Sequence, residues 1–287
     1  MYPIVSVPQV NLHNRTTPVL IGKGVGGSSA VNAMMSVRGT TEDYDRWGGF
    51  FGNSSTWNWD GLLPYFKKAL TFVPPDDEVA KSAHIKYDTS YWGNSSGVYT
   101  GWPTFQYPGT TIQFEAFKEI PGAEFPPDSG SGQAGVYWFP TLMNPKQVTR
   151  SYARTGHYDN LNRSNYHLLT GSRATQILLN GTIATGVKFV SSGGNLTSKG
   201  SPNFPTTTTL VKARNEVILA AGGIHSPQIL QLSGIGPKKL LDAANITTIV
   251  DLPGVGQNFQ DHPMLSIAIV CESIGVQTKT ETNTLTS

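Results

Sequence analysis

The chain has 287 residues, with 21 Lys and Arg against 19 Asp and Glu, which gives a net charge of +2. This length fits one large domain or two smaller ones at roughly 150 residues per domain, and the small net charge argues against nucleic acid as a partner. The single cysteine, Cys271, excludes an internal disulfide framework and a cysteine-rich zinc site. We predict no metal site, and no transmembrane segment because no run approaches the ~18 apolar residues that span a bilayer.

The N-terminal part of the chain is expected to contain one short strand and two helices. Apolar residues 19–21 predict the strand, and the glycine-rich stretch that follows predicts a turn. Ser28 and Ser29 can cap a helix that carries the apolar residues of 30–35. A second helix is expected over 60–70, where apolar residues recur at helical spacing before two lysines. Residues 74–128 lack a sustained period and predict loops and short strands.

The C-terminal part has a clearer alternation of strands and helices. Runs of β-branched and apolar residues predict strands over 167–170, 184–190, 207–213 and 216–221. The composition of 191–205 indicates a surface loop. A helix is expected over 226–232, started by Ser226 with Pro227 in its first turn. We expect 275–287 to be disordered.

Glycines 22, 24 and 27 match the G-x-G-x-x-G pattern of dinucleotide-binding turns. That pattern needs an acidic residue at the end of a second strand about 20 residues later. Glu42, Asp43 and Asp45 lie near that distance, but no apolar strand leads into them. The turn is therefore open to a second interpretation, in which it only connects a strand to a helix.

Three separated segments carry a resemblance to one enzyme family. The first signature of the glucose-methanol-choline (GMC) family of FAD-dependent oxidoreductases resembles GKGVGGSSAVNAMMSVRGTTEDYDRWG at 22–48. Its second signature resembles NEVILAAGGIHSPQILQLSGIGP at 215–237, and the segment that follows in the family is similar to DLPGVGQNFQDHP at 251–263. The three segments occur in the family's order, and the resemblance covers most of residues 1–271.

The resemblance implies an α/β fold: an incomplete FAD-binding lobe of GMC type with interleaved parts of a substrate lobe. The FAD-binding lobe would comprise residues 1–75 and 161–271, and residues 76–160 would form a substrate or cap insertion. Residues 272–287 would be a disordered tail or the start of a further part of the substrate lobe. By the same resemblance, the family's dinucleotide fingerprint is expected before Met1, and its catalytic His, with a His or Asn partner, is expected after Ser287.

The cofactor that the resemblance implies is FAD. Glycines allow backbone to approach a ligand closely, and small or polar side chains beside them leave room for it and supply hydrogen bonds. The cofactor neighbours that the resemblance implies are Gly26, Gly27, Ser28, Asn32, Ala33, Met34, Met35, Ala174, Ala221 and Gly222. Two structural alternatives stay open, namely Asn32 as a satisfied polar residue of a helix and the second-signature glycines as sites of close strand-to-helix packing.

No catalytic residue is assigned within the chain. Asp261 and His262 are adjacent, and adjacent residues of an extended segment point in opposite directions. His225 in GGIHSPQ is better explained as a residue at the entry to a helix. The remaining histidines show no spacing typical of a metal site or a catalytic triad.

The function implied by the resemblance is oxidation of CH–OH groups in an alcohol or sugar, with oxygen or a quinone as the electron acceptor. These residues alone are expected to be inactive. The alternative is a non-enzymatic remnant, or a secreted module that binds glycans or a partner without cofactor. Seven N-x-[ST] sequons favour a secreted glycoprotein, although residues 1–17 lack the pattern of a signal peptide.

Overall fold

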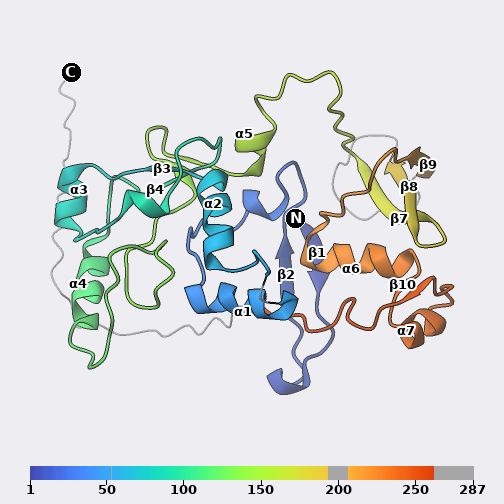
Figure 1. The fold of residues 1–287 in the computed structure, drawn as a ribbon, viewed down its shortest axis with the longest axis horizontal. Coiled ribbons are helices and arrows are strands. Elements are labelled where there is room, and N and C mark those ends of the chain that lie inside the picture. The colour runs from blue at the N-terminus through green and yellow to red at the C-terminus, as the bar shows by residue number, and fades with distance from the viewer. Residues whose placement is uncertain (53, 193–205, 262–287) are drawn as a thin grey trace, which may run out of the picture. The chain divides into compact units, whose positions relative to one another are not determined.

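The computed structural model describes residues 1–52, 54–192 and 206–261 (Figure 1). The chain divides into two compact units, Met1–Asn165 and Tyr166–Ser287. Each unit combines helices with strands, as expected of an α/β protein. The two units are described separately below.

Unit 1 contains short strands that pair locally and helices that follow them. The pairs are β1 with β2 and β5 with β6, both antiparallel, and β3 with β4, which are parallel. In chain order the elements are β1 (Tyr2–Val5), η1 (Val10–Leu12), β2 (Pro18–Ile21), η2 (Gly27–Ala30), α1 (Thr41–Phe51), α2 (Trp59–Ala69), β3 (Thr71–Val73), α3 (Asp77–Ser82), η3 (Thr89–Tyr91), β4 (Tyr99–Gly101), α4 (Pro108–Phe117), β5 (Met143–Asn144), β6 (Thr149–Arg150) and α5 (Ala153–His157).

The core of unit 1 is aromatic and contains one buried carboxylate. Phe72 of β3 stacks on Trp92 with ring centroids 5.1 Å apart and meets Trp102 edge-on at 5.6 Å. The indole nitrogen of Trp92 donates to both oxygens of Asp128, at 3.0 and 2.9 Å. Burial of these large rings stabilises the fold by about 25 cal/mol for each Å² of apolar surface removed from water. The Asp128 carboxylate fixes the orientation of the Trp92 ring.

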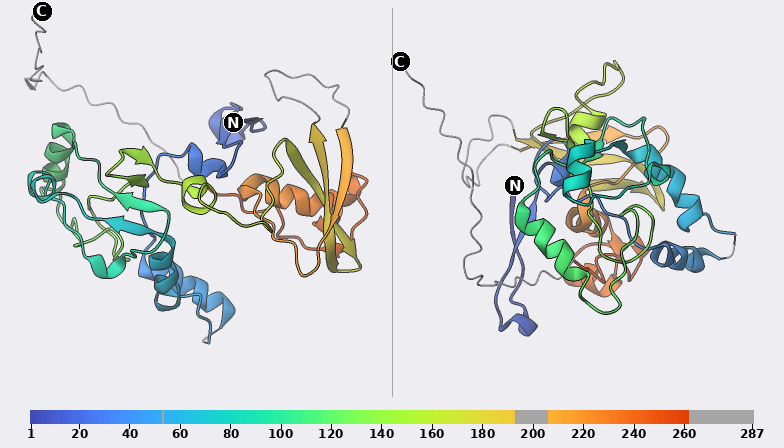
Figure 2. Two further views of the ribbon diagram at one scale, coloured as in Figure 1. Left: turned by 90° about the horizontal axis from the view of Figure 1, so that it is seen from above. Right: turned by 90° about the vertical axis from the view of Figure 1, so that its left-hand side faces the viewer.

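Unit 2 is built on a three-stranded antiparallel sheet in the order β7-β8-β9, which Figure 2 shows in two further views. Helix α6 packs against β7. Ser233, at the end of α6, accepts a hydrogen bond from the backbone nitrogen of Ile177 in β7 at 2.8 Å. The elements are β7 (Ser172–Asn180), β8 (Ile183–Ser192), β9 (Thr206–Lys212), α6 (Gly222–Leu232), β10 (Ile235–Gly236), α7 (Lys238–Ala243) and β11 (Val250–Asp251), of which β10 and β11 pair in parallel.

Four sequence predictions of elements are confirmed. The strand over 19–21 corresponds to β2, the helix over 60–70 to α2, and the strands over 184–190 and 207–213 to β8 and β9. Residues 74–128 were expected to lack helices, and this was wrong, because α3 and α4 lie there. The expected disorder of 275–287 lies outside the described residues, as does most of the loop expected over 191–205, of which 191 and 192 belong to β8.

Three further predictions are corrected by the structure. The helix over 28–35 is only the short turn η2, which ends at Ala30. The strand over 167–170 is absent, since β7 begins at Ser172. Residues 216–221 form no strand, because a strand requires a hydrogen-bonded neighbour and none of the residues that the structure describes pairs with them; Ile218 is 81% exposed.

The helix predicted over 226–232 exists but starts earlier. Helix α6 begins at Gly222, so Pro227 lies inside it rather than in its first turn. Ser226 therefore lies within α6 and is not the residue that precedes the helix and caps it. Instead, its hydroxyl oxygen accepts a hydrogen bond from the backbone nitrogen of Ala221 at 3.0 Å, reaching back to the residue before the helix.

Candidate functional site

The glycine turn of unit 1 folds back on itself. The backbone nitrogen of Gly22 donates to the hydroxyl oxygen of Ser28 at 3.1 Å, and a Cβ at Gly22 would overlap the carbonyl of Gly27. Ser29 also donates its hydroxyl to the carbonyl of Gly26. The turn is therefore held by its own polar groups, and Ser28 remains exposed.

Gly26 and Gly27 are required for different reasons. Both have positive φ, of 94° and 54°, a region that glycine occupies readily. A Cβ on Gly26 would lie 2.9 Å from the ring of Tyr152, so packing accounts for this glycine. At Gly27 no atom of the described residues beyond its chain neighbours lies within 4 Å of the Cβ position. Its bare backbone faces open space that a ligand can occupy.

The segment Asn32–Met35 is bent rather than helical. The side-chain oxygen of Asn32 accepts a hydrogen bond from the backbone nitrogen of Met34 at 3.2 Å, a local bond of the kind that competes with helix formation. Met34 has a φ of 62°, which is uncommon for a residue with a side chain. The interpretation of Asn32 as a helical residue is therefore wrong. Asn32, Ala33 and Met35 are exposed, and Met34 is half-buried.

The three expected neighbours in unit 2 lie on β7 and at the start of α6. Ala174 is exposed on β7, next to an irregularity in the pairing with β8 between Ala174 and Gln176. Such bulges turn backbone groups away from the ladder. Ala221 precedes α6, and Gly222 has a φ of 85°. In the part of the chain that the structure describes, no atom beyond its chain neighbours and the nearby backbone of α6 itself lies within 4 Å of the Gly222 Cβ position. Close strand-to-helix packing therefore does not explain Gly222.

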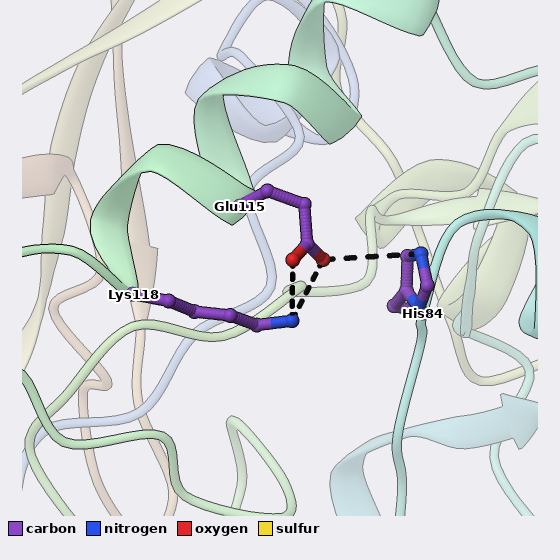
Figure 3. Close-up of polar contacts among 3 residues, drawn as sticks. All are labelled: His84, Glu115 and Lys118. Atoms are coloured by element: carbon purple, nitrogen blue, oxygen red, sulfur yellow. Dashed lines mark hydrogen bonds and ion pairs between the residues drawn. The ribbon is translucent and has the colours of Figure 1, made fainter.

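A cluster of acid and base groups lies on unit 1, at the end of α4 and in the segment after α3. The carboxylate of Glu115 contacts the ammonium group of Lys118 at 2.6 Å and the Nε2 atom of His84 at 3.8 Å (Figure 3). The hydrogen bond from Lys118 holds the pKa of Glu115 below its ordinary value. All three side chains are half-exposed, which indicates a surface ion pair rather than a catalytic group.

Other functional groups were sought over the part of the chain that the structure describes. Within 1–52, 54–192 and 206–261, no group of three or more His, Cys, Asp or Glu side chains has the geometry of a metal site. No helix among these residues is both long and apolar enough to cross a membrane. His262, which the sequence places beside Asp261, lies outside the described residues.

The comparisons with known proteins identify the family. The GMC oxidoreductase model matches residues 5–264, so the chain belongs to the GMC oxidoreductase family. It is 40% identical over 256 residues to the dehydrogenase xptC of Emericella nidulans, covering 88% of this chain and 39% of that protein. It is 34% identical over 262 residues to glucose oxidase 1 of Penicillium expansum, covering 89% and 41%.

Solved structures agree with the family assignment. An FAD-dependent oxidoreductase from Chaetomium thermophilum superimposes with a TM-score of 0.81 at 43% identity, covering 90% of this chain and 42% of that one. A fungal aryl-alcohol oxidase gives a TM-score of 0.81 at 34% identity, covering 89% and 41%. The chain thus spans about two fifths of the length of the relatives it matches. The GMC-type α/β fold is confirmed, and the matches indicate FAD as the cofactor.

The residues present fit this cofactor. The unfilled Cβ positions at Gly27 and Gly222 leave bare backbone against which a planar ring or a phosphate can lie. Seven of the ten expected neighbours lie in Gly26–Met35 of unit 1 and three lie in unit 2. Sequence reasoning did not single out Arg150, whose side chain contacts Asn32 from 118 positions away and so shares no local pattern with it.

Proposed function

We propose that this chain is the part of an FAD-dependent oxidoreductase that holds the flavin, in an enzyme acting on CH–OH groups of an alcohol or sugar with oxygen or a quinone as acceptor. The observation that carries the proposal is the family match over residues 5–264. The relatives named glucose oxidase and aryl-alcohol oxidase support the substrate class.

The proposed cofactor neighbours are the ten residues expected from the sequence. Bound FAD would supply the acceptor for a hydride from the carbinol carbon. The chain's own residues would position the cofactor. The absence of a side chain at Gly27 and Gly222 would let the cofactor lie against the backbone, and Asn32 is held in a bend beside the glycine turn. We assign no catalytic base to residues 1–287. We also propose the division into FAD-binding segments 1–75 and 161–271 around a substrate segment 76–160.

Visible absorbance and turnover test this proposal together. The protein purified in the presence of FAD is expected to retain bound flavin. Residues 1–287 alone are expected to show no turnover of primary alcohols or aldoses with an artificial electron acceptor, because the chain spans about two fifths of its relatives' length. A soluble, monodisperse but colourless protein would contradict FAD binding and favour a module without cofactor. Flavin reduction by residues 1–287 would mean that a base lies within them.

We further propose that the protein is a secreted glycoprotein. The five sequon asparagines that the structure describes are all exposed, so an oligosaccharide could reach each of them; they are Asn14, Asn94, Asn162, Asn180 and Asn245. Digestion of the protein from its native source with an amidase that removes N-glycans is expected to increase its electrophoretic mobility. Unchanged mobility would contradict this proposal.

A further inference from the structure

Arg150 joins two parts of unit 1 that are far apart in sequence. It is the last residue of β6, and its Nη1 atom donates to the side-chain oxygen of Asn32 at 2.7 Å and to the carbonyl of Ser29 at 3.2 Å. Its Nη2 atom donates to the carbonyl of Asn32 at 2.9 Å. Two nitrogens of one planar group therefore hold both the backbone and the side chain of Asn32, a geometry that a guanidinium provides and an ammonium does not.

These bonds fall on the strained part of the candidate site. The Asn32 oxygen that Arg150 contacts also accepts the backbone nitrogen of Met34, whose φ is 62°. The carbonyl of Met34 in turn accepts the backbone nitrogen of Leu142 at 2.7 Å, just before β5. The bend is thus held by Arg150 on one side and by Leu142 on the other, and uncommon backbone conformations persist only where their surroundings fix them.

The hairpin that carries Arg150 is itself firmly placed. Strands β5 and β6 pair with each other, and the backbone nitrogen of Ser151 donates to the carbonyl of Leu142 at 3.0 Å. The Ser151 hydroxyl oxygen accepts the backbone nitrogen of Tyr99 at 2.7 Å, and Ser151 is 3% exposed. Among the described residues, Arg150 makes no ion pair with a carboxylate within 4.0 Å. Its guanidinium hydrogen bonds go to the bend at Asn32 and to the carbonyl of Ser29 just before it.

We propose that Arg150 is a positioning residue that holds Asn32–Met35 in the conformation in which this segment lies along the flavin. The inference rests on the proposed function, which puts the segment at the cofactor. Arg150 acts through Asn32 and is not a catalytic residue. A cleft of about 390 Å³ bordered by Arg150, Tyr99 and Asn144 gives small molecules access to its guanidinium.

The test compares Arg150→Ala and Arg150→Lys with the control Arg154→Ala. The control removes an exposed arginine of the adjacent helix α5, which forms an ion pair with Asp159. FAD affinity is measured by flavin fluorescence, and the environment of the bound ring by its visible circular dichroism. Hydrogen exchange of residues 29–35 is measured in FAD-free protein. Arg150→Ala is expected to weaken FAD binding about 10- to 100-fold, to alter the dichroism and to speed the exchange. Added guanidinium at low concentration should restore part of each signal.

The inference is overturned if Arg150→Ala binds FAD with wild-type affinity and dichroism, or if Arg154→Ala changes them equally. Should Arg150→Ala fail to fold, Arg150→Lys decides the question, because one ammonium cannot replace the paired bonds: altered dichroism supports the inference and wild-type dichroism overturns it. Wild-type protein that binds no FAD would instead refute the proposed function, so the two failures are distinguishable.

Discussion

At the scale of single residues, Asp128 is the polar group on which the core of unit 1 depends most. It is 2% exposed, and its oxygens accept hydrogen bonds from Trp92 and from the backbone nitrogens of Asp88 and Gly130. Burial lowers the pKa of the nearby Arg38 guanidinium, and the charge of Asp128 counteracts this shift. One Arg38 nitrogen, Nη2, is buried without a hydrogen bond, so the carboxylate also compensates a buried charge.

Replacing Asp128 with Asn is therefore expected to lower the free energy of unfolding by about 2–4 kcal/mol. The amide would present a donor where the carboxylate accepts, and it would leave Arg38 without its counter-charge. Urea unfolding followed by tryptophan fluorescence measures the effect. The control Asp159→Asn breaks an exposed ion pair with Arg154 and should cost less than about 1 kcal/mol. Equal losses in the two variants would contradict this account of the core.

A second residue-scale prediction concerns the pH dependence of the cap on α1. The side-chain and backbone hydrogen bonds of Thr40 hold the pKa of Asp43 below its ordinary value. The ionised carboxylate therefore stabilises the fold above the unfolded-state pKa of about 3.9, and this contribution is lost as the pH falls through the lower folded-state value. Unfolding measured between about pH 3 and pH 7 should show wild type more stable than Asp43→Asn at neutral pH, with the difference shrinking in acid.

The control for this prediction is Glu42→Gln, which removes one charge from the same first turn of α1 without touching the Thr40 hydrogen bonds. Its unfolding free energy should follow the wild-type dependence on pH more closely than that of Asp43→Asn. A constant difference between wild type and Asp43→Asn down to about pH 3 would show that the carboxylate bonds are not part of the folded state.

At the scale of elements, one hydroxyl connects α6 to β7. Ser233 is 2% exposed, donates to the carbonyl of Ile229 at 2.6 Å and accepts the backbone nitrogen of Ile177 at 2.8 Å. Ser233→Ala would leave that nitrogen buried without an acceptor, so we expect a loss of about 1–3 kcal/mol in unfolding free energy. Ser172→Ala, at the more exposed start of β7, should change it by less than about 0.5 kcal/mol. A loss below that value in Ser233→Ala would disprove the coupling.

The elements that sequence reasoning predicted well are those whose signals are local. Helix α2 shows helical spacing of apolar residues within one segment, and β8 shows a β-branched run between turns. The segment 216–221 is likewise rich in apolar residues but finds no partner strand among the described residues, and pairing is a non-local property. The bend at Asn32–Met35 likewise depends on Leu142 and Arg150, more than 100 positions away, so the motif indicates a cofactor neighbour without revealing its conformation.

At the scale of the whole molecule, many large apolar side chains face solvent. Phe50 and Phe51 at the end of α1 are 77% and 67% exposed, and Ile218 is 81% exposed. Exposed apolar surface of this kind favours association. Residues 1–287 expressed alone are expected to bind an apolar fluorescent dye and to scatter light as oligomers. Ile218→Lys should reduce both signals, and a monodisperse wild-type protein without dye binding would contradict the expectation.

The central claim is that the chain binds FAD through the residues expected from its sequence, and hydrogen exchange with and without FAD tests it most directly. The account predicts slower exchange in peptides that cover Gly26–Met35 and in those that cover the start of α6 at Gly222, while peptides of the Glu115 surface cluster stay unchanged. Bound FAD that leaves both of the first two regions exchanging at their FAD-free rates would contradict the claim.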